Sequence, residues 1–312
     1  ENKMIKVKDI VDFLGIENIV GNQERNIVNA IQLSTENDRD DVIMWVSAKF
    51  QEKLNEVKHG VIICETLDSV SIQENCTYLI TAQPRLTFQK VLTQFFMPVK
   101  KTGISSTAKI GNNCIIGDDV FIGNNVVIED NCSIGNHTAI DHNTVIKNNT
   151  KIGHHVIIGC NCTIGGVGFG YEKDETGQFV FIPHLGNVVI QDFVEIGNNT
   201  CIDRAVLGQT ILNDNVKIDN LVHIAHGVNI GKNSLVIANA MVAGSVTVGE
   251  NTWIAPSSSI LNQKKIGNNV TIGLSAVVVK DVKDGETVIG SPAEEITVAL
   301  AKKKIMNEKL FK

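Results

Sequence analysis

Residues 116–159 read IGDDVFIGNNVVIEDNCSIGNHTAIDHNTVIKNNTKIGHHVIIG and decide the fold. An isoleucine returns at every sixth position, and the series extends beyond this stretch at both ends, at Ile104, Ile110, Ile116, Ile122, Ile128, Ile134, Ile140, Ile146, Ile152, Ile158 and Ile164. Many of these are followed by glycine and then by Asn or Asp. One face of a parallel β-helix has this pattern: a β-branched residue points inward, and a residue that can turn the chain at little energetic cost follows it. Three such faces make a triangular coil of about 18 residues.

The series is interrupted twice. Residues 166–187 carry aromatic and charged residues in place of the repeat, which predicts a projecting loop. The spacing resumes at Ile190, shifts again near residues 203–206, and then continues to Val278. Together these segments predict a mainly β chain with about nine coils of helix.

The sequence predicts three parts. Residues 1–100 do not repeat, and they combine helical spacing at 7–15 and 85–96 with buried-strand patterns at 42–46 and 61–64, which indicates a small α/β domain. Residues 101–290 form the β-helix. Residues 291–312 are expected to form a Lys-rich C-terminal helical extension that caps or flanks the open end.

Composition excludes several classes of protein. The net charge is −6 and the basic residues are scattered, so a nucleic-acid partner is not indicated. No apolar run reaches the ~18–20 residues of a membrane span. The chain has seven cysteines, no CxxC pair and no signal peptide, which favours a reducing cytoplasm and structural roles for the thiols.

The stretch LVHIAHGVNIG, residues 221–231, contains the principal candidate for chemistry. His226 lies two residues after the inward Ile224, so we expect it near a corner and facing outward. Eighteen residues further on, Gly244 is expected to stack directly above it. A histidine can take a proton from an attacking amine or hydroxyl, and an unobstructed glycine N–H can stabilise an oxyanion. The alternative is a polar corner residue beneath a turn glycine.

Hexapeptide repeats of this kind resemble the left-handed β-helix acyltransferases, which are homotrimers with active sites in clefts between subunits. Four longer segments resemble the UDP-3-O-(3-hydroxyacyl)glucosamine N-acyltransferase family: GFGY at 168–171, IPHLGNVVI at 182–190, EIGNNTCIDR at 195–204 and KIDNLVHIAHGVNIG at 217–231. The resemblance implies an enzyme of lipid A biosynthesis. That enzyme transfers a 3-hydroxyacyl group from the phosphopantetheine thioester of acyl carrier protein to the amine of a UDP-linked amino sugar, without a metal or a tightly bound cofactor.

The same resemblance assigns roles to residues. His226 matches the family's general base and Gly244 its oxyanion donor, whereas Asp219 and Asn220 match an Asp-Asn pair. Because Asn220 occupies the corner one face earlier, we expect a site composed from two subunits, with Asn220 near the donor arm and Asp219 holding the imidazole or the donor. Further substrate contacts are expected from His223, Phe169 and Tyr171. His184, where the family often has Gln, is a weaker candidate for the sugar.

The N-terminal part resembles the family along YLITAQPRLTFQKVLTQFF, residues 78–96. The family stacks a uracil between two aromatic side chains of this domain, and Trp45 and Phe50 fall at those places. The family's Asn-Pro-Lys-Tyr segment is reduced here to Ser-Ala-Lys-Phe at 47–50, so the asparagine that reads the uracil edge is missing. The alternative reading is that both aromatics are core residues.

Two other functions remain open from the sequence. VIGSPAEEI at 288–296 resembles the ending of acetyltransferases that use coenzyme A, which favours an acyl-CoA-dependent N-acyltransferase acting on another nucleotide-linked amino sugar for surface polysaccharide. Against it, a basic cluster suits an acidic carrier protein, at Lys302, Lys303, Lys304, Lys309 and Lys312. The third function is that of β-helix assemblies that hold a metal between subunits through three histidines, although only His223 and His226 are close in sequence here.

Overall fold

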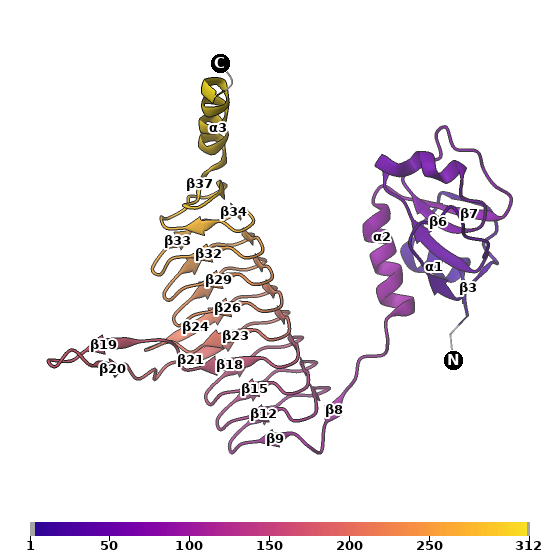
Figure 1. Ribbon diagram of the computed structural model, residues 1–312. Coiled ribbons are helices and arrows are strands. Elements are labelled where there is room, and N and C mark those ends of the chain that lie inside the picture. The colour runs from indigo at the N-terminus through magenta and orange to yellow at the C-terminus, as the bar shows by residue number, and fades with distance from the viewer. Residues whose placement is uncertain (1–3, 311–312) are drawn as a thin grey trace. The chain divides into compact units, whose positions relative to one another are not determined.

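The computed structural model of the chain describes residues 4–310, and the chain divides into two compact units, Glu1–Lys100 and Lys101–Lys312. The first unit is a five-stranded sheet in the order β2-β7-β6-β5-β4, with a separate antiparallel pair β1-β3. Helix α2 packs on β5 and β6 (Figure 1). The elements are β1 Ile5–Lys6, α1 Val7–Leu14, β2 Ile19–Val20, β3 Asn26–Ile27, β4 Asn29–Ala30, β5 Val42–Trp45, the 3₁₀ helix η1 Ala48–Asn55, β6 Gly60–Cys64, β7 Cys76–Ile80, α2 Pro84–Val91 and the π turn η2 Leu92–Phe96.

The second unit confirms the predicted left-handed parallel β-helix, whose coils stack into three sheets (Figure 1). The eleven-stranded sheet contains β8 Gly103–Ile104, β11 Phe121–Ile122, β14 Ala139–Ile140, β17 Ile157–Ile158, β22 Glu195–Ile196, β25 Lys217–Ile218, β28 Leu235–Val236, β31 Trp253–Ile254, β34 Thr271–Ile272, β36 Thr287–Ile289 and β37 Glu294–Glu295. The nine-stranded sheet contains β9 Lys109–Ile110, β12 Val127–Ile128, β15 Val145–Ile146, β18 Thr163–Gly166, β23 Cys201–Asp203, β26 His223–Ile224, β29 Met241–Val242, β32 Ser259–Ile260 and β35 Val277–Val278. The eight-stranded sheet contains β10 Ile115–Ile116, β13 Ser133–Ile134, β16 Lys151–Ile152, β21 Asn187–Ile190, β24 Gln209–Leu212, β27 Asn229–Ile230, β30 Thr247–Val248 and β33 Lys265–Ile266.

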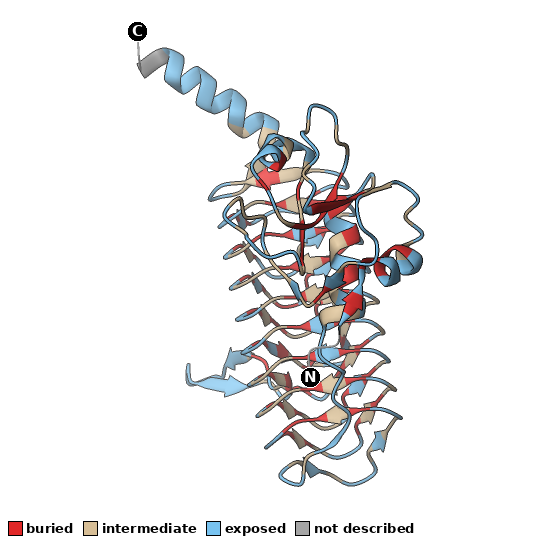
Figure 2. Cartoon of the chain, turned by 90° about the vertical axis from the view of Figure 1, so that its right-hand side faces the viewer, coloured by how far each residue is buried: buried red, intermediate tan, exposed pale blue. Residues whose placement is uncertain are grey.

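The isoleucine series forms the core of the β-helix. Each inward residue pairs with its equivalent in the next coil, as Ile110 does with Ile128 and Ile128 with Ile146. From Ile122 to Ile164 these side chains are completely or almost completely buried along the axis, where Figure 2 shows the buried residues in red. Burial of each such side chain stabilises the fold by about 1.5–3 kcal/mol, so the series is the main source of stability of this unit.

The corners differ from the expectation that the repeat glycines turn the chain. The left-handed backbone conformation is adopted by the residue three positions after the inward one, usually asparagine, as at Asn113 with φ 55°. Asparagine tolerates this conformation because its short polar side chain can bond locally. Gly111 is needed for a different reason, since a Cβ there would lie 2.7 Å from the backbone nitrogen of Asp130 in the next coil. The glycines therefore permit close approach of successive coils.

The two interruptions are insertions that leave the ladder intact. Across the first, Ile152 pairs with Ile190, and the inserted chain forms an antiparallel hairpin of β19 Tyr171–Lys173 and β20 Phe179–Phe181 that projects from the β-helix (Figure 1). Across the second, Ile202 pairs with Ile224. The chain leaves the β-helix at both places and returns in register.

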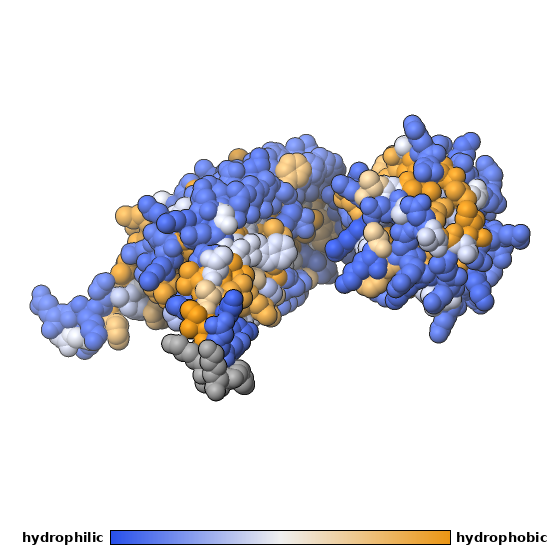
Figure 3. Space-filling model, turned by 90° about the horizontal axis from the view of Figure 1, so that it is seen from above, coloured by the Kyte–Doolittle hydropathy of each residue, from blue (hydrophilic) through white to orange (hydrophobic). Residues whose placement is uncertain are grey.

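The C-terminal segment ends the eleven-stranded sheet. Strand β37 pairs antiparallel with β36, and helix α3, Ile296–Leu310, contacts both. Four apolar residues of α3 are exposed: Val298, Leu300, Ile305 and Met306. Figure 3 shows hydrophobic surface, in orange, among hydrophilic residues when the chain is seen from above. Within residues 4–310, no helix is both long and apolar enough to cross a membrane.

The burial pattern makes the stability of the β-helix position-dependent. We expect Ile140→Ala, at a fully buried position, to lower the free energy of unfolding by about 2–5 kcal/mol through lost burial and the resulting cavity. Ile104→Ala is the matched control, because Ile104 in the first strand is 52% exposed and should cost much less. Chemical denaturation of both variants checks this, and equal destabilisation would contradict it.

Candidate functional site

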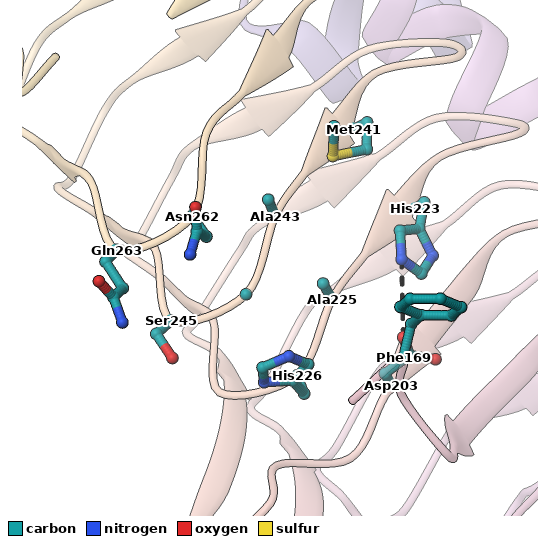
Figure 4. Close-up of a pocket in the computed structure, with 11 residues that line it drawn as sticks. Phe169, Asp203, His223, Ala225, His226, Met241, Ala243, Ser245, Asn262 and Gln263 are labelled. Carbon is teal, nitrogen blue, oxygen red and sulfur yellow. Dashed lines mark ion pairs between the residues drawn. The ribbon is translucent and has the colours of Figure 1, made fainter. Parts of the chain in front are cut away.

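A pocket of about 320 Å³ opens at one corner of the β-helix, where the nine-stranded sheet turns toward the eight-stranded sheet (Figure 4). Three successive coils supply its walls with the corner residues 225–226, 243–245 and 262–263. The pocket is lined by Phe169, Asp203, His223, Ala225, His226, Met241, Ala243, Gly244, Ser245, Asn262 and Gln263. Of the residues chosen from the sequence, this pocket brings together His226, Gly244, His223 and Phe169.

Gly244 lies directly against the imidazole of His226. A Cβ placed on Gly244 would be 2.6 Å from Cε1 and 2.7 Å from Nε2 of the ring. The register of the coils produces this contact, because the carbonyl of His226 accepts a hydrogen bond from the N–H of Ser245 at 2.9 Å. No side chain other than hydrogen fits at residue 244 without displacing the ring.

The surroundings of His226 favour its neutral form. Partial burial lowers the pKa of the imidazole, and the neighbouring His184 and His223 lower it further. A neutral imidazole has a free lone pair, which a general base requires. His226 therefore has the protonation state of a base at neutral pH.

Asp203 is a pocket residue that sequence reasoning missed. Its carboxylate lies 3.6 Å from Nε2 of His223, and burial raises its pKa while the two neighbouring histidines oppose that shift. Figure 4 shows this ion pair beneath the Phe169 ring. Asp203 follows Ile202 at the second phase shift, outside the regular repeat. The sequence offered one signal for this residue: it is charged, and it directly follows an inward isoleucine at the point where the six-residue spacing breaks.

The hairpin brings a row of aromatic rings to the corner that carries His226. Phe169 contacts Tyr171 at 5.0 Å between ring centroids, Tyr171 contacts Phe181 at 5.6 Å, and Phe181 stacks on His184 at 5.7 Å. His184 in turn meets the edge of His226 at 5.2 Å. Phe169 lines the pocket, whereas Tyr171 lies one ring behind it.

Asp219 and Asn220 lie at a different corner of the same chain, after β25. Asp219 accepts hydrogen bonds from the backbone N–H groups of Asn220 at 2.7 Å and Ala238 at 3.1 Å. Asn220 accepts one from the backbone of Asn198 at 2.7 Å. Neither residue lines the pocket around His226. Within one chain, both side chains brace adjacent coils.

The N-terminal unit has its own cavity of about 680 Å³, in which Trp45 lies with Glu65, Pro84 and Leu86. Phe50 lies outside this cavity and is 46% exposed. The ammonium groups of Lys49 and Lys53 approach its ring at 5.5 and 5.3 Å from the centroid. The structure therefore does not place Trp45 and Phe50 on two sides of one cavity.

The cysteines and histidines form no metal cage in the part of the chain that is described. No three His, Cys, Asp or Glu side chains of residues 4–310 come together as ligands. Cys132 and Cys162 occupy buried repeat positions, and burial raises the pKa of the Cys132 thiol to about 11. These thiols are therefore protonated packing residues at neutral pH.

A left-handed hexapeptide β-helix with a neutral histidine against an open glycine corner defines a hexapeptide-repeat acyltransferase. Two solved structures share this fold: a UDP-N-acetylglucosamine O-acyltransferase of Moraxella catarrhalis is 28% identical with a TM-score of 0.56, over 62% of this chain and 73% of that chain. A UDP-N-acetylglucosamine acyltransferase of Francisella novicida is 25% identical with a TM-score of 0.57, over 62% and 68%.

Sequence comparison defines the family more narrowly. The UDP-3-O-acylglucosamine N-acyltransferase of Campylobacter lari is 44% identical over 252 residues, which cover 77% of this chain and 78% of that protein. The protein of the same name from Helicobacter pylori is 36% identical over 77% and 75%. A family model described as the GMPPB C-terminal domain matches residues 99–168 of the β-helix. The chain belongs to the UDP-3-O-acylglucosamine N-acyltransferase family and is an acyltransferase, as the sequence predicted.

The contact between Gly244 and His226 predicts a strong effect of one methyl group. Gly244→Ala should lower kcat by about 100-fold, because the added methyl displaces the imidazole ring of His226. The melting temperature should change little. Gly166→Ala is the control, since its methyl would be 3.4 Å or more from its neighbours. Steady-state kinetics and thermal unfolding of both variants check this, and a fully active Gly244→Ala enzyme would refute it.

The lowered pKa of His226 predicts the acid side of the pH profile. A base works only when unprotonated, so activity is lost as the pH falls through its pKa. That midpoint should lie below the ~6.5 of an ordinary histidine. The measurement is kcat/KM between pH 4.5 and 8. A midpoint above about 7 would contradict the burial argument.

Proposed function

We propose that this chain transfers a 3-hydroxyacyl group from the phosphopantetheine thioester of acyl carrier protein to the amine of a UDP-linked amino sugar, as a step of lipid A biosynthesis. The observation that carries the proposal is the His226 imidazole held against Gly244 in a pocket that three coils and the hairpin enclose. The names of the Campylobacter lari and Helicobacter pylori relatives support the same reaction class.

In the proposed mechanism the sugar nitrogen attacks the thioester carbonyl and forms the C–N bond. His226 takes the proton that the nitrogen releases. The carbonyl of Gly244 accepts a hydrogen bond from Gln263 N–H at 2.9 Å, whereas its own N–H bonds to no backbone carbonyl of residues 4–310 and can donate to the oxyanion. When the intermediate collapses, the C–S bond breaks and the thiolate leaves with the proton from His226.

The proposal places the complete site in a homotrimer. Asn220 and Asp219 are assigned to the corner that a neighbouring subunit would bring to His226, with Asn220 near the donor arm. Their side chains lie on the outer surface of the β-helix corner, which supports this role. An interface between two different surfaces of the same chain is heterologous, and such interfaces form closed symmetric rings when the rotation between subunits closes.

The N-terminal unit is proposed as the uridine-binding domain. The cavity beside Trp45 is large enough for a nucleobase, and Trp45 offers an aromatic face. Phe50 would have to approach this cavity to complete the stack. Tyr171 and Phe169 of the hairpin, together with His223, are proposed to contact the sugar from the side of the β-helix.

The donor is proposed to be acyl carrier protein, with no tightly bound cofactor. The exposed Lys302, Lys303 and Lys304 of α3 support docking of an acidic carrier, and Lys302 pairs with Glu294. The side chain of Lys309 is not among those described. Lys312 lies outside the described residues. The seven cysteines are free thiols, which supports a cytoplasmic location.

Coenzyme A as donor is the second candidate. The segment VIGSPAEEI forms β36, a tight turn and β37 at the end of the β-helix, and it resembles the ending of coenzyme A-dependent acetyltransferases. In that case the product would be another nucleotide-linked N-acylamino sugar for surface polysaccharide.

A thioester-consumption assay tests the proposal with the full chain. The donors are 3-hydroxyacyl carrier protein and short acyl-coenzyme A, each with UDP-linked amino sugars. We expect turnover with the carrier protein, and a loss of about 10²–10⁴-fold in His226→Ala. His137→Ala, which removes a half-exposed imidazole from an earlier coil, should retain full activity. Turnover only with acyl-coenzyme A would replace the proposal by the second candidate, and an active His226→Ala enzyme would refute the mechanism.

A further inference from the structure

His184 carries a buried nitrogen without a hydrogen-bond partner. The residue is 6% exposed, and its Nε2 atom finds no partner among the residues described. Leaving a buried polar atom unpaired costs about 1–3 kcal/mol, so such atoms are uncommon and often mark function. His184 belongs to the IPHLG segment that follows the hairpin and packs beside His226.

The other ring nitrogen fixes the tautomer of His184. Its Nδ1 lies 2.8 Å from the carbonyl oxygen of Ile182. A carbonyl can only accept, so Nδ1 carries the hydrogen. In the neutral ring Nε2 then has a lone pair, and it needs a donor.

The ring of His226 borders the same space as this unpaired nitrogen. A Cβ placed on Gly168 would lie 2.9 Å from His184 Nε2 and 3.1 Å from His226 Cδ2, so both atoms border the same small space. A half-turn of the His226 ring about Cβ–Cγ exchanges Cδ2 with Nδ1 and leaves the ring plane unchanged. The same half-turn exchanges Nε2 with Cε1, and both of these positions lie against Gly244. The turned ring therefore keeps a nitrogen at the reacting face.

We propose that His184 is a positioning residue for the catalytic base: its Nε2 accepts a hydrogen bond from Nδ1–H of His226 in this half-turned orientation. A row of hydrogen bonds then links the Ile182 carbonyl, His184 and His226. In this row each imidazole donates from Nδ1 and has its accepting lone pair on Nε2. The last lone pair in the row, Nε2 of His226, faces the substrate amine. A base that is oriented by a second group, itself oriented by a third, is the general arrangement of catalytic triads.

The hairpin gives this row its rigidity. Phe181 stacks on His184. The two nearby glycines have no room for a methyl group, because a Cβ on Gly168 would lie 2.9 Å from Nε2 of His184 and a Cβ on Gly170 would lie 3.0 Å from its Cε1. Gly168 and Gly170 therefore let the hairpin close over the imidazole. The row also joins the pocket to the hairpin that is proposed to contact the sugar.

The inference rests on the proposed role of His226 as the base, and the experiment separates the two. The full chain is labelled with ¹⁵N-histidine, and the tautomer of His226 is read from its ring ¹⁵N shifts above its pKa, with His226→Gln for assignment. We expect the Nδ1–H form in the unaltered protein, which is the minor form of a free neutral imidazole. His184→Leu should shift His226 toward the Nε2–H form and lower kcat by about 10- to 100-fold, with KM within about twofold.

His184→Gln is the conservative variant, because its amide oxygen can accept the same hydrogen bond. It should keep the Nδ1–H form and hold kcat within about threefold of the unaltered enzyme. His137→Leu controls for loss of an imidazole elsewhere, and thermal unfolding verifies that each variant folds. The Nε2–H form in the unaltered protein would overturn the inference, as would a His184→Leu enzyme with unchanged tautomer and kcat. Failure of the unaltered protein to turn over any donor would refute the proposed function alone, since the tautomer is measured without substrate.

Discussion

Parallel hydrogen bonding between strands that are mostly two residues long ties each coil of the β-helix to the next. A slip of one residue would turn the inward side chains to solvent, so each side chain lies over its equivalent in the preceding coil. Inward positions then stack isoleucine on isoleucine, and corners stack polar side chains on backbone. The corner at His226 obeys the same constraint, since His226 has space for its ring only because the next coil has glycine at residue 244.

The regular part of the molecule could therefore be predicted by counting. The strict spacing of Ile104 to Ile164 predicts the coils, and adding 18 to the number of His226 finds Gly244. In the N-terminal unit, the helical spacing at 85–96 corresponds to helix α2, which ends at Val91, and to the π turn that follows it. The reason for the repeat glycines was misjudged, because contact between coils depends on three-dimensional spacing that the turn argument ignored.

Counting failed where the chain leaves the repeat. Asp203 and His184 lie at the two insertions, so the spacing gives no indication of what they face. Asp203 reaches the pocket through an irregular pairing of Gly166 with Asp203, and His184 through the fold of the hairpin back onto β21. The ionised Asp203 also carries a cost. Because burial raises the pKa of the Asp203 carboxyl, the folded protein holds this proton more tightly than the unfolded chain does. The protonated carboxyl therefore contributes to the free energy of unfolding at low pH, and this contribution is lost as the pH rises through the raised pKa. The His223 ion pair offsets part of the loss.

The hairpin insertion has a consequence for how such enzymes diversify. Because Ile152 pairs with Ile190 as directly as it would with a residue 18 positions away, the extra chain changes only the length of the loop that must close. Loop-closure entropy grows so slowly that roughly doubling this length costs only about 0.6 kcal/mol. The buried side chains of one coil stabilise the fold by more than this entropic cost. Evolution can thus lengthen, shorten or exchange the hairpin while the coils beneath it fold as before.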